Sequence, residues 1–336
     1  MPEQSDGGMS EMRIGPLFSV VIPTVNRVES LATAVGSALD CGEHGSVEVI
    51  VVPNGEGDSW RIALADHLEN PMVRVLPISA ANANMARNHG LRHARGDFVR
   101  FLDDDDFLIP DGARKQHEII LRDGLDLAAG SMEARKSDGT FVRRYPSHCS
   151  DDFCEDVASP HQYFLVHSLV FRTALAQSIP WDEEDPFFHE QLWHIALCAE
   201  QELRWDRVDD TVGVWVQHGG SRTSMMHGVH NHRYAVAIHL CGLAEALEKN
   251  NRLTAGRRSA IAGGIWSCMY PAFALHPVLW TSLAGKARSL DPRARPAQRL
   301  FNSVPTRNIN PLAVYVLLYP LIAILAAGRV LRRSFL

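Results

Sequence analysis

The chain has 336 residues, which is enough to bury a large hydrophobic core and suggests one large domain with an appendage, or two domains. Hydrophobic residues make up 46% and charged residues 21% of a chain whose net charge is −6, so the composition is globular and argues against a nucleic-acid partner. The cysteines form no Cys-x-x-Cys pair and the N-terminus lacks the charged-then-apolar order of a signal peptide, which predicts a cytoplasmic protein with mostly free thiols.

After a small, polar N-terminus that we expect to be disordered over residues 1–15, the chain alternates apolar runs with helical patterns. The runs that predict strands lie at residues 18–22, 47–52, 73–76 and 97–102. The helical patterns between them lie at residues 31–39 and 85–94. Such alternation is typical of β-α-β units and predicts an α/β fold, with a doubly wound, mostly parallel sheet and flanking helices.

The middle of the chain continues this pattern, and its end is helical. Further helices are expected at residues 112–122 and 188–200, and further strands at residues 125–129, 167–172 and 211–217. From residue 234 the pattern stays helical to the end. We therefore expect an α/β domain over residues 16–228 and a helical, partly apolar extension over residues 229–336.

Four consecutive aspartates, Asp103 to Asp106, follow the fourth predicted strand, at the edge of the sheet where ligands of such folds bind. Like charges repel and Asp is poor in strands and helices, so the run either lies in water or is compensated by a cation. Asp103 and Asp105 lie two residues apart, and in an extended turn both carboxylates can hold Mg²⁺ or Mn²⁺. An idle acidic turn, or a helix N-cap by Asp106, is the competing interpretation.

Three segments of the first domain carry recognisable motifs: VVIPTVNR at residues 20–27, VEVIVVPNGEGD at 47–58 and ANMARNHGLRHARGDFVRFLDDDDFLIPD at 83–111. In this order and spacing they resemble the inverting family 2 glycosyltransferases. The resemblance implies that residues 16–228 form a catalytic domain with the GT-A fold. It also implies transfer of a sugar from a nucleotide-diphospho-sugar to an acceptor hydroxyl with inversion, assisted by Mg²⁺ or Mn²⁺, in bacterial-type surface polysaccharide or glycolipid assembly.

The same resemblance gives individual residues their expected roles. Asp103 and Asp105 match a D-x-D pair, in which one carboxylate lies near the donor ribose and the other binds the metal that bridges the diphosphate. Arg87 matches an arginine close to the nucleotide, and the competing interpretation is an exposed helix residue. Glu190 takes the place of the catalytic base, and His218 matches a histidine that reaches the metal or the diphosphate. The other positions expected at the nucleotide are Pro23, Thr24, Asn26, Arg27, Asn54 and Asp104.

Some positions depart from the family pattern. Val25 stands where an aromatic residue usually packs on the base, and Pro53 stands where an acidic residue usually contacts a pyrimidine. Either another residue reads the base, or the nucleotide is not the usual uridine diphosphate. Glu190 replaces an aspartate, and Glu184 or Asp185 is the alternative base.

Two other functions stay open. One is a degenerate, non-catalytic member of the family that binds nucleotide or scaffolds an assembly. The other is a sugar-phosphate nucleotidyltransferase, which also uses a doubly wound sheet and Mg²⁺. That class normally has a Gly-rich phosphate loop after the first strand, where this chain has Pro23-Thr24-Val25.

The extension contains two segments without charged residues, within 259–285 and 309–328, and it is basic from Lys286 to Arg333. Basic residues beside apolar helices suit an anionic membrane surface, so we expect membrane association at the cytoplasmic face of the inner or plasma membrane. Such a location would be convenient for a glycan or lipid-linked acceptor. A spanning or re-entrant anchor, helices lying in the membrane interface, and buried helices that cap the catalytic domain all remain open.

Overall fold

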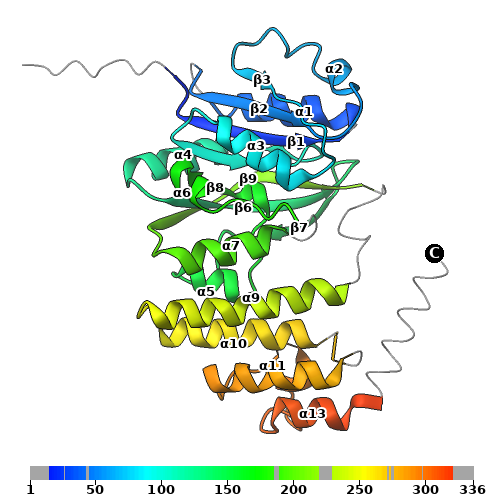
Figure 1. The fold of residues 1–336 in the computed structure, drawn as a ribbon, viewed down its shortest axis with the longest axis vertical. Helices are drawn as coiled ribbons and strands as arrows, with labels where there is room; N and C mark the ends of the chain where they lie inside the picture. The colour runs from blue at the N-terminus through cyan, green and yellow to red at the C-terminus, as the bar shows by residue number, and fades with distance from the viewer. Residues whose placement is uncertain are drawn as a thin grey trace, which may run out of the picture.

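A mixed β-sheet flanked by helices forms one half of the protein, and a stack of helices forms the other (Figure 1). The computed structural model describes residues 15–25, 27–42, 45–184, 189–218, 229–270, 272–273, 276–296 and 298–320. The predicted disorder of residues 1–15 therefore falls, except for Gly15, outside the described residues.

The described part of the chain forms nine strands in the order β3-β2-β1-β4-β8-β6-β9-β5, and β7 pairs with β6. Their bounds are β1 (Phe18–Thr24), β2 (Val47–Pro53), β3 (Val73–Val75), β4 (Phe98–Phe101), β5 (Phe107–Leu108), β6 (Leu127–Lys136), β7 (Phe141–Tyr145), β8 (Leu169–Arg172) and β9 (Trp205–Gln217). Pairing is parallel from β3 to β4 and between β6 and β9, whereas β5, β7 and β8 run antiparallel to their neighbours. The predicted α/β fold with a mostly parallel sheet is confirmed.

The helices connect these strands and then continue alone. Their bounds are α1 (Val28–Leu39), α2 (Trp60–Ala63), α3 (Ala83–His93), α4 (Pro110–Arg122), α5 (Phe153–Ala158), α6 (Thr173–Ser178), α7 (His189–Glu200), α9 (Val229–Lys249), α10 (Ala255–Met269), α11 (Pro277–Leu290), α12 (Arg299–Asn302) and α13 (Pro311–Leu317). A 3₁₀ turn, Val166–Ser168, precedes β8. The prediction missed β5, β7, α2, α5 and the first half of β9, and it placed the strand that became β6 too early.

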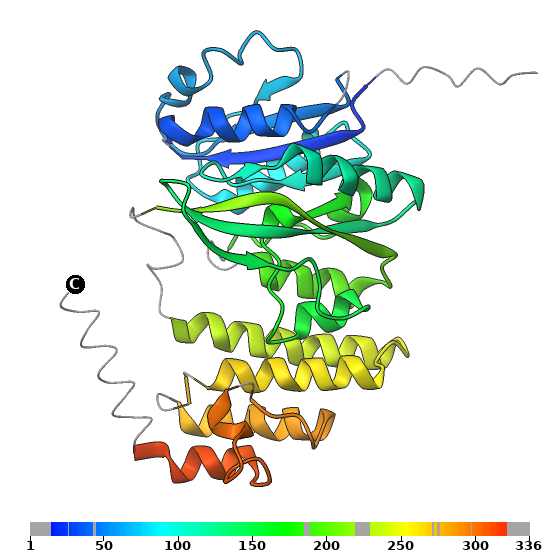
Figure 2. The same cartoon turned by 180° about the vertical axis from the view of Figure 1, so that it is seen from behind.

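Strands β1 and β2 are buried along their whole length and mostly apolar, because both faces of the sheet are covered. Val20 and Ile22 of β1 pack with α1 and α4 on one face, whereas Val21 packs with α3 and α7 on the other. Figure 2 shows α1 and α4 on the face that is hidden in Figure 1. Helix α3 lies close to the sheet at Gly90, where a Cβ atom would stand 2.4 Å from Cγ1 of Val21. This close packing fixes the distance between α3 and the face of the sheet formed by β1 and β2.

The helical extension packs on the sheet domain through α5 and α7. Helix α9 lies against α7, α10 lies against α5, and α11 lies against α10 (Figure 1). Arg257 of α10 is 6% exposed and forms ion pairs with Glu202, and with Asp152 at 2.8 Å. The extension is therefore joined to the domain by a buried apolar interface and by a partly buried charge network.

The charge-free segment 259–285 forms the end of α10 and the start of α11. Its two tryptophans, Trp266 and Trp280, are interior residues, each at most 1% exposed, whereas Val278 at the start of α11 is 86% exposed. The structure therefore agrees with buried helices over the part of this segment that packs around the two tryptophans. No helix within the described residues combines the length and the apolar character needed to cross a bilayer. Segment 309–328 lies only partly within those residues.

Candidate functional site

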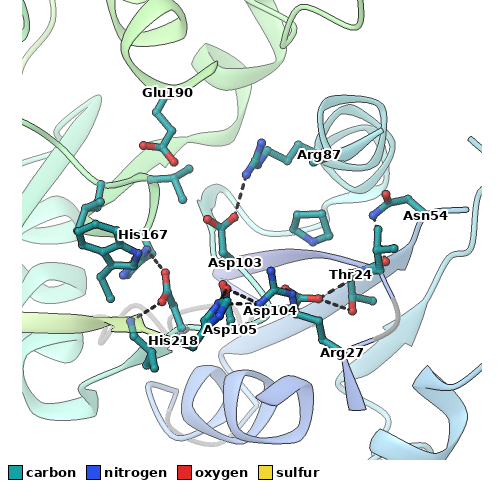
Figure 3. A pocket seen from close by; sticks show the side chains of 18 of the residues that line it. Thr24, Arg27, Asn54, Arg87, Asp103, Asp104, Asp105, His167, Glu190 and His218 are labelled. Carbon is teal, nitrogen blue, oxygen red and sulfur yellow. Dashed lines mark hydrogen bonds and ion pairs between the residues drawn. The ribbon is translucent and has the colours of Figure 1, made fainter. Parts of the chain in front are cut away.

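A cleft of about 350 Å³ opens at the carboxyl ends of β1, β2 and β4. It collects residues from distant parts of the sequence, and Figure 3 shows their side chains converging on the aspartate run. The predicted site residues that line it are Pro23, Thr24, Arg27, Asn54, Arg87, Asp103, Asp104, Asp105, Glu190 and His218. Asn26, also predicted to belong here, lies outside the described residues.

The four aspartates occupy the turn between β4 and β5, and each carboxylate has its own partners. Asp103 accepts a hydrogen bond of 2.8 Å from Nη2 of Arg87. Asp105 accepts one of 2.6 Å from Nη1 of Arg27, and its Oδ2 also lies 2.7 Å from Nε2 of His218. The like charges are thus compensated from several sides by groups of the chain itself, so the aspartate run does not lie free in water.

Asp104 is 7% exposed and is turned towards the end of β1. Its Oδ2 accepts hydrogen bonds from Oγ1 of Thr24 at 2.6 Å and from the backbone N–H of Val25 at 3.4 Å. Burial raises the pKa of this carboxyl to about 7, although the Thr24 hydrogen bond and the Arg27 charge oppose that rise. Asp104 therefore ties the carboxyl ends of β1 and β4 together beside the cleft.

Asp106 is 3% exposed and accepts a hydrogen bond of 2.8 Å from the backbone N–H of Val216. Its Oδ2 lies 3.6 Å from Nδ1 of His167. Burial and the neighbouring Asp105 and Asp103 charges raise its pKa well above the ordinary value. The alternative that Asp106 caps the next helix is wrong: α4 has Ile109 at its N-cap, because β5 separates the acidic turn from that helix.

The acidic turn presents ligand atoms suited to a small divalent cation. One carboxylate oxygen each from Asp103, Asp105 and Asp106 lies within 4.8 Å of the others. Oδ2 of Asp105 and Nε2 of His218 are 2.7 Å apart. Two adjacent ligands of an octahedral ion at about 2.1 Å stand about 3 Å apart, so this pair fits Mg²⁺ or Mn²⁺. The predicted metal residues, Asp105 and His218, are therefore brought together.

Arg87 projects from α3 towards Asp103, as Figure 3 shows. Only 5% of the residue is exposed, its Nη1 donates to Oδ1 of Asn84 at 3.1 Å, and its guanidinium lies 4.8 Å from the ring centroid of Trp181. An exposed helix arginine would have none of these contacts, so that alternative is wrong. The packing leaves Arg87 a fixed cation on the wall of the cleft.

Glu190 enters the cleft from the first turn of α7. Its Oε2 accepts a hydrogen bond of 3.1 Å from the hydroxyl of Tyr163. Burial in the cleft and the Asp103 charge raise its pKa to about 7, while Arg87 and the Tyr163 hydrogen bond hold that rise back. Glu184, one alternative base, is exposed and does not line the cleft, and Asp185, the other, lies outside the described residues.

Two aromatic residues hold α7 in place. The rings of Trp181 and Trp193 stack with centroids 4.6 Å apart and planes inclined by 8°. Both residues are at most 4% exposed, so they belong to the core and do not offer a platform to a sugar. The aromatic residues that do line the cleft are Tyr163 and Trp215. Sequence reasoning missed both, since one lies in a loop without a motif and the other in an ordinary strand pattern.

The end of the cleft beside β1 and β2 is formed by Thr24 and Asn54. Asn54 is 4% exposed, and both its backbone N–H and its Nδ2 donate to the carbonyl oxygen of Thr24, at 2.9 and 3.1 Å. Val25 is 48% exposed at the rim, and Pro53 ends β2 opposite Thr24. Neither offers the ring or the carboxylate that family members usually place there.

Comparisons with known proteins agree with this architecture. The family model described as glycosyl transferase family 2 matches residues 19–188. The succinoglycan biosynthesis protein ExoO of Rhizobium meliloti is 30% identical over 131 residues, covering 39% of this chain and 37% of ExoO. An uncharacterized glycosyltransferase of Haemophilus influenzae is 31% identical over 164 residues, covering 48% of this chain and 64% of the relative.

A third relative is the Escherichia coli enzyme UDP-Glc:alpha-D-GlcNAc-diphosphoundecaprenol beta-1,3-glucosyltransferase WfgD, 25% identical over 117 residues, with 35% of this chain and 46% of WfgD covered. The chain thus spans between about a third and two thirds of the length of these curated relatives.

A crystal structure of S. aureus TarS in complex with UDP-GlcNAc matches with a TM-score of 0.62 at 17% identity, over 82% of each chain. That likeness concerns the fold, including part of the helical extension. Because the family model covers half of the sequence, from β1 to the turn before α7, the chain belongs to glycosyltransferase family 2.

Proposed function

We propose that this protein transfers a sugar from a nucleotide-diphospho-sugar to an acceptor hydroxyl with inversion at the anomeric carbon. One observation carries the proposal. The Arg87–Asp103 pair, the Asp105–His218 pair and Glu190 come from separate stretches of the chain and line a single cleft. Displacement of a nucleoside diphosphate requires positive charge beside the leaving diphosphate, which Arg87 and a metal ion at Asp105 and His218 would supply. It also requires a base for the acceptor hydroxyl, which the carboxyl of Glu190 would supply.

The donor would lie with its nucleoside at Thr24 and Asn54 and its diphosphate between Arg27 and Arg87. Guanidinium groups suit phosphate because they donate several hydrogen bonds in one plane. Asp105 and His218 would hold the divalent cation, with Asp103 as a further ligand. When bound, that cation would stabilise the negative charge that develops on the departing diphosphate. Asp104 keeps Thr24 in position through its 2.6 Å hydrogen bond.

Glu190 would act as the general base. Figure 3 shows it on one side of the aspartates, with Thr24 and Asn54 on the other. A base on the side of the sugar opposite the leaving diphosphate is the arrangement that inversion needs. Because Tyr163 hydrogen bonds to Oε2, the other oxygen, Oε1, would take the proton from the acceptor hydroxyl. With a pKa of about 7, Glu190 is ionised in a large share of molecules at neutral pH.

The acceptor class is suggested by the relatives. ExoO is named for succinoglycan biosynthesis and WfgD for glucosyl transfer to a diphosphoundecaprenol-linked sugar. We extend the proposal to surface polysaccharide or glycolipid assembly, with a glycan or lipid-linked acceptor. Contact with the cytoplasmic face of a membrane suits this acceptor, and it is supported by the exposed Val278 of α11 and Leu317 of α13, which are 86% and 72% exposed. Sedimentation with anionic and neutral vesicles would test the membrane contact.

Calorimetric titration with a panel of nucleoside diphosphates, with and without Mn²⁺, tests the donor site. We expect metal-dependent binding of one nucleotide that Asp105→Asn abolishes. Supplying the matching sugar nucleotide with candidate acceptors should then release the nucleoside diphosphate. Release of pyrophosphate from a nucleoside triphosphate and a sugar phosphate would identify a nucleotidyltransferase instead. Binding without any turnover would favour the non-catalytic alternative.

A further inference from the structure

Arg27 lies where a metal ion held by Asp105 and His218 would lie. Its Nη1 is 2.6 Å from Oδ2 of Asp105 and 2.9 Å from Nε2 of His218, and these two atoms are 2.7 Å from each other. The three atoms thus form a small triangle, with the cationic nitrogen in contact with both metal-type ligand atoms. Figure 3 shows the Arg27 side chain reaching the aspartate run from the β1 side.

Nη1 of Arg27 is the cationic group that contacts both of the other atoms. Nε2 of a neutral histidine carries either a proton or a lone pair, but not both. With a lone pair Nε2 accepts one N–H of Arg27 Nη1, whose other N–H donates to Oδ2 of Asp105; with a proton Nε2 itself donates to Oδ2 of Asp105. The first state, with the lone pair, is also the one in which histidine binds a metal ion. In the first state the guanidinium satisfies the same lone pairs, on the same two atoms, that a divalent cation would use.

We infer that Arg27 is the resident counter-cation of this site, and that its Nη1 and a divalent metal ion are alternative occupants of the position between Asp105 and His218. The inference rests on the proposed metal site. Binding of the ion would displace Nη1 from these two atoms. The contacts of Nη1 with Asp105 and His218 would in turn lower the affinity of the site for the ion.

The anchoring of Arg27 allows such an exchange. Its Nε lies 3.4 Å from Oδ1 of Asp104, so a second carboxylate can retain the guanidinium after Nη1 is displaced. The Arg27 side chain is 35% exposed, and ion pairs in partly solvated positions are weak enough to be replaced. Once displaced, Nη1 would be free to donate to a phosphate oxygen beside the ion. One arginine would thus stabilise the aspartates without metal and the diphosphate with it.

Binding of Mn²⁺ alone to the full chain, followed by electron paramagnetic resonance and calorimetry, tests the inference without any need for activity. Arg27→Gln removes the competing cation and should tighten Mn²⁺ binding about threefold to tenfold. Arg27→Lys keeps the charge but cannot bridge two ligand atoms in one plane, so its affinity should lie between those of the wild type and Arg27→Gln. Asp105→Asn should abolish Mn²⁺ binding both in the wild type and in Arg27→Gln.

Arg122→Gln is the matched control, because it makes the same charge change at an exposed arginine that pairs with Asp123 at the end of α4. Its Mn²⁺ affinity should equal that of the wild type. Thermal unfolding establishes that each variant is folded. If Arg27→Gln does not fold, the Mn²⁺ affinity of Arg27→Lys is compared with that of the wild type instead.

Equal Mn²⁺ affinity of wild type, Arg27→Gln and Arg27→Lys would overturn the inference, and so would an absence of Mn²⁺ binding in all of them. These results are separate from the fate of the proposed function. If the wild type transfers sugar but the wild type and the Arg27 variants bind Mn²⁺ equally well, only the inference about Arg27 is contradicted. Tighter Mn²⁺ binding by Arg27→Gln, in a protein whose wild type transfers no sugar, would support the role of Arg27 and contradict the proposed transferase function.

Discussion

The hydroxyl of Tyr163 donates a hydrogen bond of 3.1 Å to Oε2 of Glu190, joining the loop after α5 to the first turn of α7. The effect is reciprocal. The hydrogen bond lowers the pKa of Glu190, while the Glu190 charge, together with burial, raises the pKa of Tyr163 well above its ordinary value. Tyr163 therefore remains a donor over the working pH range and occupies one carboxylate oxygen of Glu190.

Glu190→Gln should lower kcat by about 10² to 10⁴-fold, since the amide cannot accept the proton of the acceptor hydroxyl. Nucleotide binding should be nearly unchanged, because Glu190 has no place in the proposed donor site. Calorimetry and the rate of nucleoside diphosphate release measure the two effects separately. Glu184→Gln is the control, since Glu184 is exposed outside the cleft, and a loss of rate there equal to that of Glu190→Gln would reassign the base.

The activity should depend on pH through Glu190. A base works only when ionised, so kcat/KM should rise with pH to a plateau above about 7, the pKa of Glu190. Tyr163→Phe removes a hydrogen bond that favours the ionised form, so the pKa rises and the acidic limb moves to higher pH. A pH profile of the variant measures this shift. A uniform loss of rate with an unmoved limb would show that Tyr163 has only a structural role.

Gly90→Ala should destabilise the protein by about 1–3 kcal/mol, because the new Cβ would meet Cγ1 of Val21 at 2.4 Å and the helix must move off the sheet. The shift should also weaken nucleotide binding, since Arg87 lies one turn away on α3. Gly242→Ala in the exposed face of α9 meets nothing within 4 Å and should stabilise by about 0.5–1 kcal/mol. Urea unfolding gives both values, and equal effects at the two positions would contradict the packing argument.

Arg257→Met should lower the free energy of unfolding by about 1.5–3 kcal/mol, because it removes charged hydrogen bonds from Glu202 and from the partly buried Asp152. The neighbouring Arg258→Met should cost less than about 0.5 kcal/mol, since among the described side chains Arg258 pairs only with the exposed Glu248, at 3.4 Å. The comparison, by urea unfolding at pH 7, measures how strongly the charge network joins the extension to the sheet domain.

The contribution of Arg257 to the free energy of unfolding should decrease at acidic pH. The hydrogen bond from Arg257, helped by that from Arg252 and by both charges, lowers the pKa of Glu202 from 4.5 to about 2. A depressed folded-state pKa contributes stability above the unfolded value that is lost as the pH falls from about 4.5 towards 2. The difference between wild type and Arg257→Met should therefore shrink from pH 6 to pH 3. Glu202 is 60% exposed, so solvent screening limits the size of the change. A difference that stays constant with pH would contradict the assignment to Glu202.

Local sequence patterns were enough to locate the first strands and helices. The runs at residues 18–22 and 47–52 became β1 and β2, and the helical pattern from residue 85 became most of α3. These elements are readable because each buries an apolar face or run that is contiguous or periodic in the sequence. Strands β5 and β7 were not readable, since β5 has two residues and β7, with the pattern FVRRY, is exposed along most of its length.

The sequence by itself determined the family, the acidic turn at the end of β4 and the types of residue able to bind a nucleotide. Only the tertiary structure decided which of them meet: that Asp104 turns to Thr24, that Asp106 is buried against Val216, that Tyr163 reaches Glu190, and that Arg27 stands between Asp105 and His218. The physical reason is that propensity and periodicity act over a few neighbouring residues. The direction of these side chains is instead set by partners that the fold brings together from 27 to 191 positions away.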